Sequence, residues 1–189
     1  MQIWVGLGNP GAQYALHRHN VGFMAADIIA EVHGFGSWAK KFRSLISEGR
    51  IGGQRILLVK PQTYMNDSGD AVQQALRFHK LGVEDLTVFH DELDLTPMKV
   101  KVRTGGGLAG HNGLRSINAS LGPDFRRVRI GIGHPGNKAL VTNYVLGNYP
   151  KSEMEPLADL LGAIAAEAEW LAQRDDARFM SDVALRLQQ

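Results

Sequence analysis

The sequence predicts an α/β fold: a single-domain, twisted, mixed β-sheet flanked by α-helices, spanning residues 1–189. Short apolar runs alternate along the chain with segments of helical periodicity, which is the pattern of an α/β domain. Gly52-Gly53 separates two strand-like segments, as in a two-residue hairpin turn. Met98–Arg103 alternates apolar and polar residues, which is typical of a strand with one solvated face. Hairpins are antiparallel and strand–helix–strand units are parallel, so the sheet should contain both kinds of pairing.

The first half of the chain provides three expected strands and two expected helices. The first strand, Gln2–Leu7, ends in a loop containing Gly6, Gly8 and Gly11. The first helix carries apolar residues near helical spacing and is followed by Gly34; the second has Asn66, Asp67 and Ser68 as possible caps and Gly82 as its stop. The remaining elements, in order, are the helix Asn20–His33, the hairpin strands Leu45–Ile51 and Arg55–Val59, and the helix Ser68–His79.

The second half continues the alternation and ends in helices. The expected strands are Leu86–His90, Met98–Arg103 and Val128–Ile132, and a glycine-rich loop, Gly105–Gly110, leads to a helix over Leu114–Leu121. Ser152 and Glu155 have the spacing of a capping box, which predicts a long helix from there to about Gln173 and a helical tail after it. Residues 152–187 are therefore expected to form a C-terminal helical segment of the same domain.

Composition excludes several classes of protein. The chain has 189 residues, 44% of them apolar, and no cysteine, so thiolate zinc sites, iron–sulfur clusters and disulfide scaffolds are excluded. No apolar run approaches the roughly 20 residues that span a bilayer, and the first residues lack the basic region of a signal peptide. We therefore expect a soluble cytoplasmic protein that does not associate with a membrane.

The net charge of +2 hides an uneven distribution. Residues 1–150 contain 17 basic and 11 acidic side chains, whereas 151–189 contain 4 and 8. The stretch 97–138 alone carries eight basic residues against the single acid Asp124. This excess suggests a polyanionic partner such as a nucleic acid, although an ordinary solvated basic face would show the same pattern.

Familiar cofactor-binding and catalytic motifs are incomplete or absent in this sequence. Residues 6–11 match the glycine spacing of a dinucleotide fingerprint, but Pro10 lies inside the loop and no acid ends the next strand. Residues 105–110 have P-loop glycine spacing, but His111-Asn112 replaces the required Lys-Ser/Thr. No serine lies in a G-x-S-x-G context and no H-E-x-x-H pair is present, so neither a serine nucleophile nor a metalloprotease site is indicated.

What remains is a set of histidine, asparagine and aspartate residues at the ends of predicted elements. It comprises Asn9, His19-Asn20, Met65-Asn66, Asp91 and His111-Asn112. An imidazole oriented by a carboxylate can take a proton from water, and asparagine amides can donate hydrogen bonds to an oxyanion. The set therefore suits ester hydrolysis, although each residue alone is more often a cap or a satisfied polar group.

At these same positions the chain resembles the bacterial-type peptidyl-tRNA hydrolases over nearly its whole length. The matching blocks, in chain order, are 5–11 (VGLGNPG), Tyr14, 18–20 (RHN), 61–63, 65–66 (MN), 68–69 (SG), 90–94 (HDELD), 105–107 (GGG), 110–114 (GHNGL), 129–136 (RIGIGHPG) and 145–147 (VLG). So many ordered matches make the resemblance highly specific.

The resemblance implies hydrolysis of the ester that joins a peptide, or an N-blocked aminoacyl group, to the 3′-terminal ribose of tRNA. This reaction recycles tRNA from peptidyl-tRNA released by stalled ribosomes. It implies no cofactor and no metal. His19 corresponds to the general base, with Asp91 orienting it and Asn9 also in the catalytic set. The substrate-binding residues it implies are Tyr14, Met65, Asn66, Gly110, His111 and Asn112.

The resemblance also implies a binding partner for the basic stretch 97–138. Arg103, Arg129 and Lys138 correspond to residues that would hold the phosphates of the tRNA acceptor stem while the CCA end enters the cleft. The chain departs from the family pattern at Arg103, where lysine is common, and at Leu108-Ala109, where His-Gly is common. The family also suggests a monomer that does not bind DNA. Two alternatives stay open: a non-catalytic RNA-binding protein on the same fold, and a hydrolase of small esters or peptides.

Overall fold

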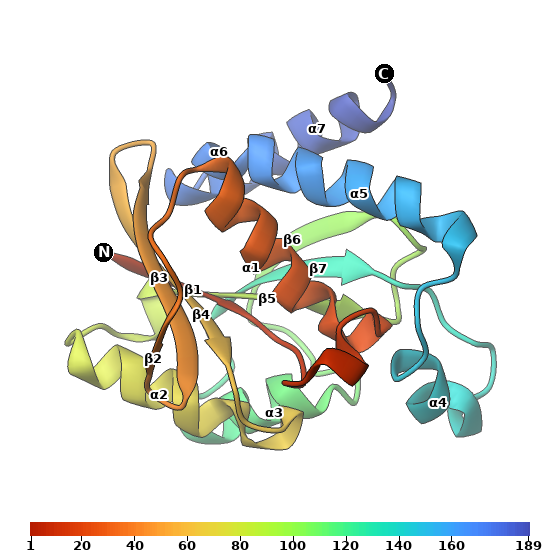
Figure 1. Cartoon of the computed structure of the whole chain (residues 1–189), viewed down its shortest axis with the longest axis horizontal. Coiled ribbons are helices and arrows are strands. Elements are labelled where there is room, and N and C mark those ends of the chain that lie inside the picture. Colours follow the sequence, from red (N-terminus) through yellow and green to blue (C-terminus); the bar gives the residue numbers. More distant parts are fainter.

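A computed structural model describes all residues from Met1 to Gln189, and it confirms the predicted fold class: one mixed β-sheet with helices on both faces (Figure 1). The seven strands are β1 (Gln2–Gly6), β2 (Ala39–Lys41), β3 (Ser44–Ile51), β4 (Gln54–Pro61), β5 (Leu86–Glu92), β6 (Val100–Thr104) and β7 (Arg126–Gly131). The α-helices are α1 (Val21–Val32), α2 (Ser68–Phe78), α3 (Asn112–Leu121), α4 (Val141–Val145), α5 (Lys151–Ala166), α6 (Ala168–Ala172) and α7 (Asp176–Leu187).

The strands follow the order β2-β3-β4-β1-β5-β7-β6. The central strands β4, β1, β5 and β7 are parallel, whereas β2, β3 and β6 pair antiparallel at the two edges. The predicted hairpin is confirmed, since β3 and β4 are joined by Gly52 and Gly53, both with positive φ, 56° and 78°. A two-residue turn with both central residues in this region matches the right-handed twist of the strands.

Two apolar cores lie on opposite faces of the sheet. On one face α1, α5, α6 and α7 pack over a cluster that includes Trp4, Leu58 and Phe89. On the other face α2 and α3 cover a smaller cluster that includes Val5 and Val88. The side chains of the central strands alternate between the two clusters, as a strand buried on both faces requires.

A close contact between glycines brings α1 onto the ends of two parallel strands. A Cβ added to Gly6 would lie 2.2 Å from the carbonyl oxygen of Gly22, and one added to Gly22 would lie 2.3 Å from that of Phe89. Only glycine permits this approach of backbone to backbone. The first turn of α1, and the 3₁₀ turn η2 (Arg18–Asn20) before it, therefore sit at the carboxyl ends of β1 and β5.

The predicted bounds of α2, Ser68–His79, agree with the structure to within one residue, but the predicted caps were wrong. None of the proposed cap side chains caps the helix, and the Ser68 hydroxyl instead donates to the Met65 carbonyl oxygen at 2.7 Å. The helix ends at Phe78, and Lys80 rather than Gly82 takes the left-handed conformation that follows, with φ 56°. Predictions from cap residues failed here because the turn Met65–Asp67 leads directly into the helix and supplies its backbone contacts.

The predicted capping box at Ser152 and Glu155 was also wrong. The helix α5 begins at Lys151 with Pro150 at the cap position, and no side chain caps it. The expected single helix to Gln173 is interrupted at Glu167, whose backbone leaves the helical region (φ −100°, ψ 9°) and separates α5 from α6. Helices over 151–187 nevertheless confirm that the C-terminal segment is helical.

The start of β6 and two short elements also differ from the prediction. Strand β6 starts at Val100 and not at Met98, because Met98 has a positive φ of 66°. The short elements β2 and α4 were not predicted, since three or five residues show too little periodicity to be recognised. None of the helices is both long and apolar enough to cross a membrane.

Candidate active site

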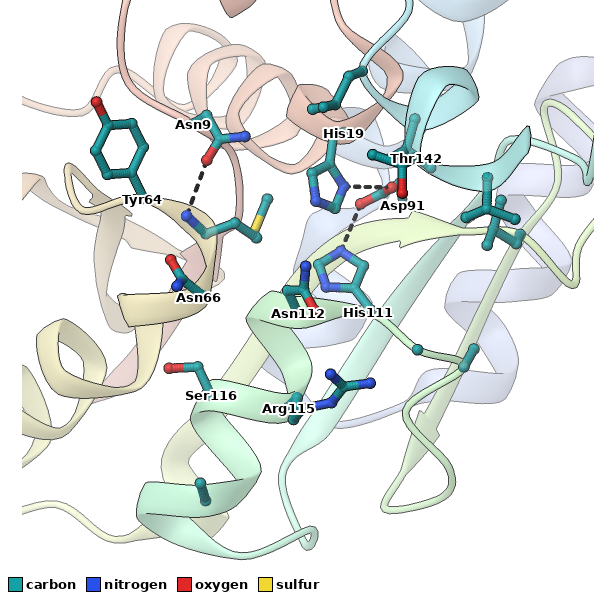
Figure 2. Close-up of a pocket in the computed structure, with 18 residues that line it drawn as sticks. Asn9, His19, Tyr64, Asn66, Asp91, His111, Asn112, Arg115, Ser116 and Thr142 are labelled. Atoms are coloured by element: carbon teal, nitrogen blue, oxygen red, sulfur yellow. Dashed lines mark hydrogen bonds and ion pairs between the residues drawn. The ribbon is translucent and has the colours of Figure 1, made fainter. Parts of the chain in front are cut away.

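A pocket of about 630 Å³ opens at the carboxyl ends of β1 and β5 (Figure 2). This is where α/β sheets usually place their sites, and the volume falls within the range of small-ligand pockets, roughly 300–1,000 Å³. Its lining comes from the loop after β1, from η2, from the turn η3 (Met65–Asp67) before α2, from the end of β5, and from α3 and α4.

Asp91 and His19 form the floor of the pocket. Asp91 is the sixth residue of β5 and His19 lies in η2, so the glycine contact of α1 with the sheet brings them together. The His19 Nδ1 atom lies 2.8 Å from Asp91 Oδ2, and both residues are buried. A Nδ1–H bond to the carboxylate leaves the Nε2 atom of His19 as the nitrogen free to accept a proton.

His111 holds the other oxygen of the same carboxylate. Its Nε2 lies 2.7 Å from Asp91 Oδ1, and its Nδ1 accepts hydrogen bonds from the backbone N–H groups of Gly113 and Leu114 at 3.1 and 3.3 Å. An acceptor at Nδ1 requires the neutral tautomer with the proton on Nε2, so His111 donates to Asp91. The imidazole is thus the N-cap of α3 and a hydrogen-bond donor to Asp91 at once.

The electrostatics of this group favour a charged Asp91 beside a basic His19. Burial lowers the pKa of His19, but the charge of Asp91 and the hydrogen bond to it outweigh burial, and the pKa is raised above 6.5. Burial acts to raise the pKa of Asp91, but the two histidines hold it well below its usual value. The carboxylate therefore stays ionised wherever His19 titrates.

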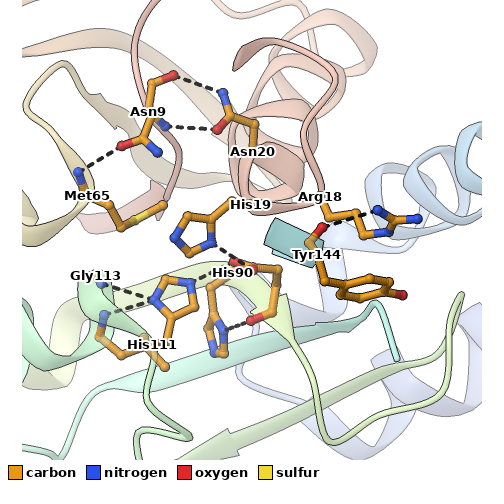
Figure 3. A network of polar contacts seen from close by, with 11 residues as sticks. Asn9, Arg18, His19, Asn20, Met65, His90, His111, Gly113 and Tyr144 are labelled. Atoms are coloured by element: carbon orange, nitrogen blue, oxygen red, sulfur yellow. Dashed lines mark hydrogen bonds and ion pairs between the residues drawn. The ribbon is translucent and has the colours of Figure 1, made fainter. Parts of the chain in front are cut away.

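A third histidine, His90, lies beneath this group and is excluded as a base. It is fully buried in β5, its Nδ1 donates to the Asp91 carbonyl oxygen at 2.8 Å, and its ring stands edge-on to that of His111 with centroids 5.3 Å apart (Figure 3). Burial, together with the nearby His111, lowers its pKa to about 3. His90 is therefore neutral throughout the physiological pH range.

Asn9 faces the pocket with its amide nitrogen. Its backbone N–H donates to Asn20 Oδ1 and its carbonyl oxygen accepts from Asn20 Nδ2, both at 2.9 Å, which fixes the loop after β1. Its side-chain Oδ1 accepts from the Met65 backbone N–H at 2.9 Å. Because the oxygen is occupied in this way, the Nδ2 group of Asn9 is left as a donor toward the pocket (Figure 2).

The floor also has the residue types of a metal site. One ligand atom from each of His19, Asp91 and His111 lies within 4.8 Å of the others. These atoms already pair with one another through two N–H···O bonds, and the far nitrogen of His111 caps α3. A cation would have to displace both ring protons, so the donor set fits a hydrogen-bonded group better than a metal site.

The structure brings most of the predicted site residues together. Of the predicted set, those that line the pocket are Asn9, His19, Met65, Asn66, Asp91, Gly110, His111 and Asn112. Tyr14 is the exception: it is outside the lining, and its ring packs edge-on against His17 at 5.3 Å. The prediction missed Tyr64, Arg115, Ser116 and Thr142; Arg115 and Ser116 follow Asn112 by three and four residues on α3, a spacing that was available in the sequence.

The eight basic residues of the stretch 97–138 comprise two buried and five exposed side chains, with Arg129 intermediate. Arg126 and Arg127 are buried: Arg126 pairs with Asp176, and Arg127 donates to the carbonyl oxygens of Gly107 and Pro123. These two charges support the fold, so the charge excess available to a partner is smaller than the sequence suggested. Lys99, Lys101, Arg103, Arg115 and Lys138 are exposed.

The three predicted phosphate ligands differ in their surroundings. Arg103 lies on the edge strand β6 with its guanidinium against Gly106, whose φ of 101° favours glycine at this point of the loop. Arg129 is partly buried, and its Nε donates to Glu92 Oε1 at 2.9 Å while its terminal nitrogens have no protein partner. Lys138 is exposed at the start of the segment before α4.

A family model described as "Peptidyl-tRNA hydrolase" matches residues 3–189 of the chain. The chain is 70% identical to the peptidyl-tRNA hydrolase of Sphingopyxis alaskensis, with all of both chains covered, and 68% identical to that of Rhizorhabdus wittichii, with 99% of each covered. Among solved structures it is similar to the peptidyl-tRNA hydrolase of Acinetobacter baumannii, with a TM-score of 0.91 and 38% identity over 97% of this chain and 94% of that one.

Proposed function

Since the chain belongs to the peptidyl-tRNA hydrolase family and hydrolyses peptidyl-tRNA, we propose that His19, Asp91 and Asn9 carry the chemical step. The observation that carries this assignment is the double hydrogen bonding of Asp91: each oxygen accepts from one imidazole, so the carboxylate holds His19 in a single tautomer and orientation. The free Nε2 of His19 then faces the pocket as the base.

In the proposed reaction, water is the nucleophile. As its oxygen bonds to the ester carbonyl carbon, His19 Nε2 takes one of its protons and the carbonyl oxygen becomes an oxyanion. The Nδ2 group of Asn9 donates to that oxyanion, a contribution of about 3 kcal/mol for a single donor of this kind. The bond to the ribose oxygen then breaks, and the imidazolium, stabilised by Asp91, returns the proton to the departing ribose.

The two ends of the substrate use the two sides of the pocket. We assign the side chains of Asn66 and Met65 to the peptide, and those of Asn112 and the backbone at Gly110 to the terminal ribose, with His111 acting through Asp91. Asn66 and Asn112 are exposed and make no side-chain hydrogen bond within the protein, so both amides are available to a ligand. Tyr14, outside the lining, is left with no role in this assignment.

The tRNA body is proposed to lie across the exposed cations beside the pocket. Arg103, Arg129 and Lys138 would hold acceptor-stem phosphates while the CCA end enters. Contacts to phosphate and to the terminal ribose recognise tRNA by its shape and not by its sequence. All groups of the pocket come from one chain, so we propose that a monomer acts alone, in the cytoplasm where translation supplies the substrate.

We further propose that residues 1–189 fold as one unit. Both apolar clusters are built on the same central strands, and α7 at the end of the chain pairs through Asp176 with Arg126 in β7. A single cooperative unfolding transition is the expected behaviour.

The test is release of N-acetyl-aminoacyl groups from tRNA by the EDTA-treated protein, with unblocked aminoacyl-tRNA as the comparison substrate. The wild type should cleave the blocked ester without added metal and leave the unblocked one, and His19→Ala should bind tRNA without cleaving it. His79→Ala, which changes a histidine packed edge-on against Phe42 and Phe78 outside the pocket, is the matched control and should retain full activity.

Other outcomes would change the role assigned to His19 or the proposed function itself. Activity that survives in His19→Ala would remove His19 as the base. Binding without turnover in the wild type would favour the RNA-binding alternative, and cleavage of simple esters at a rate insensitive to salt would favour a small-ester hydrolase.

A further inference from the structure

One wall of the pocket is only weakly anchored in the core. Helix α4 contributes Val141, Thr142 and Val145 to the lining, and Leu146, its C-cap, follows them. None of its five residues is fully buried, although Tyr144 and Val145 pack, partly buried, against the larger apolar cluster. Burial of apolar surface therefore stabilises this helix less than the others, and contacts with neighbouring segments of the chain add to what holds the wall.

Arg18 supplies most of those contacts. Its guanidinium lies over the ring of Tyr144, 4.1 Å from the centroid, and Nη1 donates to the Tyr144 carbonyl oxygen at 3.2 Å (Figure 3). Its backbone N–H donates to the carbonyl oxygen of Gly147 at 3.0 Å. The Tyr144 hydroxyl in turn donates to the carbonyl oxygen of Ile132, just beyond β7. Arg18 and Tyr144 therefore link α4 to η2 on one side and to the sheet on the other.

The surroundings of Arg18 add further contacts. The ring of Tyr149 lies 5.8 Å from the guanidinium, and the carboxylate of Glu153 lies 3.9 Å from Nη2. The backbone N–H of Tyr149 donates to the Leu16 carbonyl oxygen at 3.0 Å, so the chain after α4 runs beside the chain before His19. The arginine side chain is only 14% exposed, which makes its aromatic and ionic contacts stronger than they would be at an open surface.

We propose that Arg18 is a positioning residue for the reaction: it clamps the α4 wall to the turn that carries His19 and so fixes the pocket around the acyl–ribose end of the substrate. This inference rests on the proposed role of the pocket. Arg18 does not line the pocket and does not touch the reacting atoms; it acts through α4, which it ties to η2.

The side-chain chemistry requires arginine at this position. A planar guanidinium can stack on Tyr144 and donate in its own plane to the carbonyl oxygen at the same time, whereas a lysine ammonium offers a point charge with no plane. Arg18→Lys therefore keeps the charge but loses the stacked and hydrogen-bonded geometry. The weakened cation–π contact and the lost hydrogen bond should loosen α4 against η2, while the backbone bonds from Arg18 and Tyr149 keep the two segments side by side.

The experiment compares Arg18→Lys with the wild type in steady-state hydrolysis of N-acetyl-aminoacyl-tRNA. We expect KM to rise about tenfold while kcat changes less than twofold, since the wall holds substrate and the base is untouched. The matched control is Arg178→Lys, which removes a similar stack, 3.9 Å over the ring of Trp170, on α7 away from the pocket; its KM should equal that of the wild type. Tyr144→Leu removes the aromatic ring from the other side of the contact and should reproduce the effect if Arg18→Lys folds poorly.

A second readout does not depend on turnover. The backbone N–H groups of Leu146 and Gly147 bond within the α4 segment, and their hydrogen exchange should accelerate in Arg18→Lys and Tyr144→Leu but not in Arg178→Lys. Unchanged hydrogen exchange at Leu146 and Gly147, or an unchanged KM in both variants, would overturn the proposed positioning role of Arg18. Failure of the wild type to cleave the ester would instead contradict the proposed function, and the exchange measurement would still decide on the clamp.

Discussion

The pocket floor and the exposed basic edge of the sheet use charge in opposite ways. On the floor, Asp91 is almost without solvent contact, and both of its oxygens accept hydrogen bonds from imidazoles that are themselves held in place. On the edge, Arg103 is exposed with no carboxylate partner, and so is Lys138 in the segment before α4. The hydrogen bonds of the floor are already formed in the absence of substrate, whereas the exposed cations are left free to pair with a polyanion.

The difference indicates which step each region controls. Fixed groups in a buried site are organised before the reaction and lower its barrier, so their loss should reduce kcat. Exposed cations gain their partners only on binding and are screened by salt, so their loss should raise KM and flatten its salt dependence. Arg129 lies between the two, with Nε committed to Glu92 and its terminal nitrogens free.

The sharpest test of the floor is His19→Ala. Removal of the proposed base should lower kcat by about ten thousandfold, near the upper limit for general base catalysis, with KM nearly unchanged. Single-turnover kinetics at saturating enzyme would isolate the chemical step. A rise in KM with kcat preserved would instead place His19 among the binding residues and contradict its assignment to the chemical step.

Asp91→Asn should have the next largest effect, about a thousandfold on kcat. The asparagine amide can donate to His19 Nδ1, which would put the ring proton on Nε2 and leave no base facing the pocket. His90→Gln is a useful control in the adjacent residue, because His90 bonds only to a backbone carbonyl oxygen and does not touch the carboxylate side chain. A kcat close to wild type in Asp91→Asn would show that His19 does not need orientation.

Asn9→Ala should lower kcat by about a hundredfold, the usual cost of one oxyanion donor. The same change in Asn66 or Asn112 should act mainly on KM, because these exposed amides are assigned to substrate. If Asn112→Ala lowers kcat as much as Asn9→Ala, the oxyanion donor has been assigned to the wrong side of the pocket.

The smallest effects belong to the basic edge. Arg103→Gln and Lys138→Gln should each raise KM several-fold and make the logarithmic dependence of binding on salt shallower by about one unit, the change expected for one lost phosphate contact. Arg178→Gln, which removes a charge from α7, should leave both quantities unchanged. Equal salt slopes in all variants would remove these residues from the tRNA surface.

Local sequence signals predicted the fold well where they depend on neighbours in the chain. The Gly52-Gly53 turn and the alternation of apolar runs with helical periodicity were read correctly because turn geometry and side-chain periodicity are properties of a few adjacent residues. The capping box at Ser152 and the break at Glu167 were not, because α5 begins without a side-chain cap and no glycine or proline marks the break.

For the site, the motif resemblance identified eight of the 18 lining residues but not their arrangement. Nothing in the local sequence shows that His111 caps α3 with one nitrogen while it donates to Asp91 with the other. Nor does it show that Arg127 on β7 is buried against the glycine-rich loop while Arg103 on the neighbouring strand β6 is exposed, since both lie in the same basic stretch. Burial is a property of the packed molecule, and the basic stretch could be divided only once the structure was known.

The most direct test of the central claim, that Asp91 makes a neutral His19 the base, is the pH dependence of kcat/KM in the wild type and in Asp91→Asn, with the His19 ring followed by NMR. The base form appears as pH rises through the pKa of His19, which Asp91 raises above 6.5 against the effect of burial. The account predicts an acid limb above pH 6.5 in the wild type, matched by the His19 resonance. In Asp91→Asn, the carboxylate charge that raises the pKa of His19 is gone while burial remains, so the limb of the residual activity should move to lower pH. A wild-type limb below 6.5, or one that does not move when Asp91 is replaced, would contradict the account.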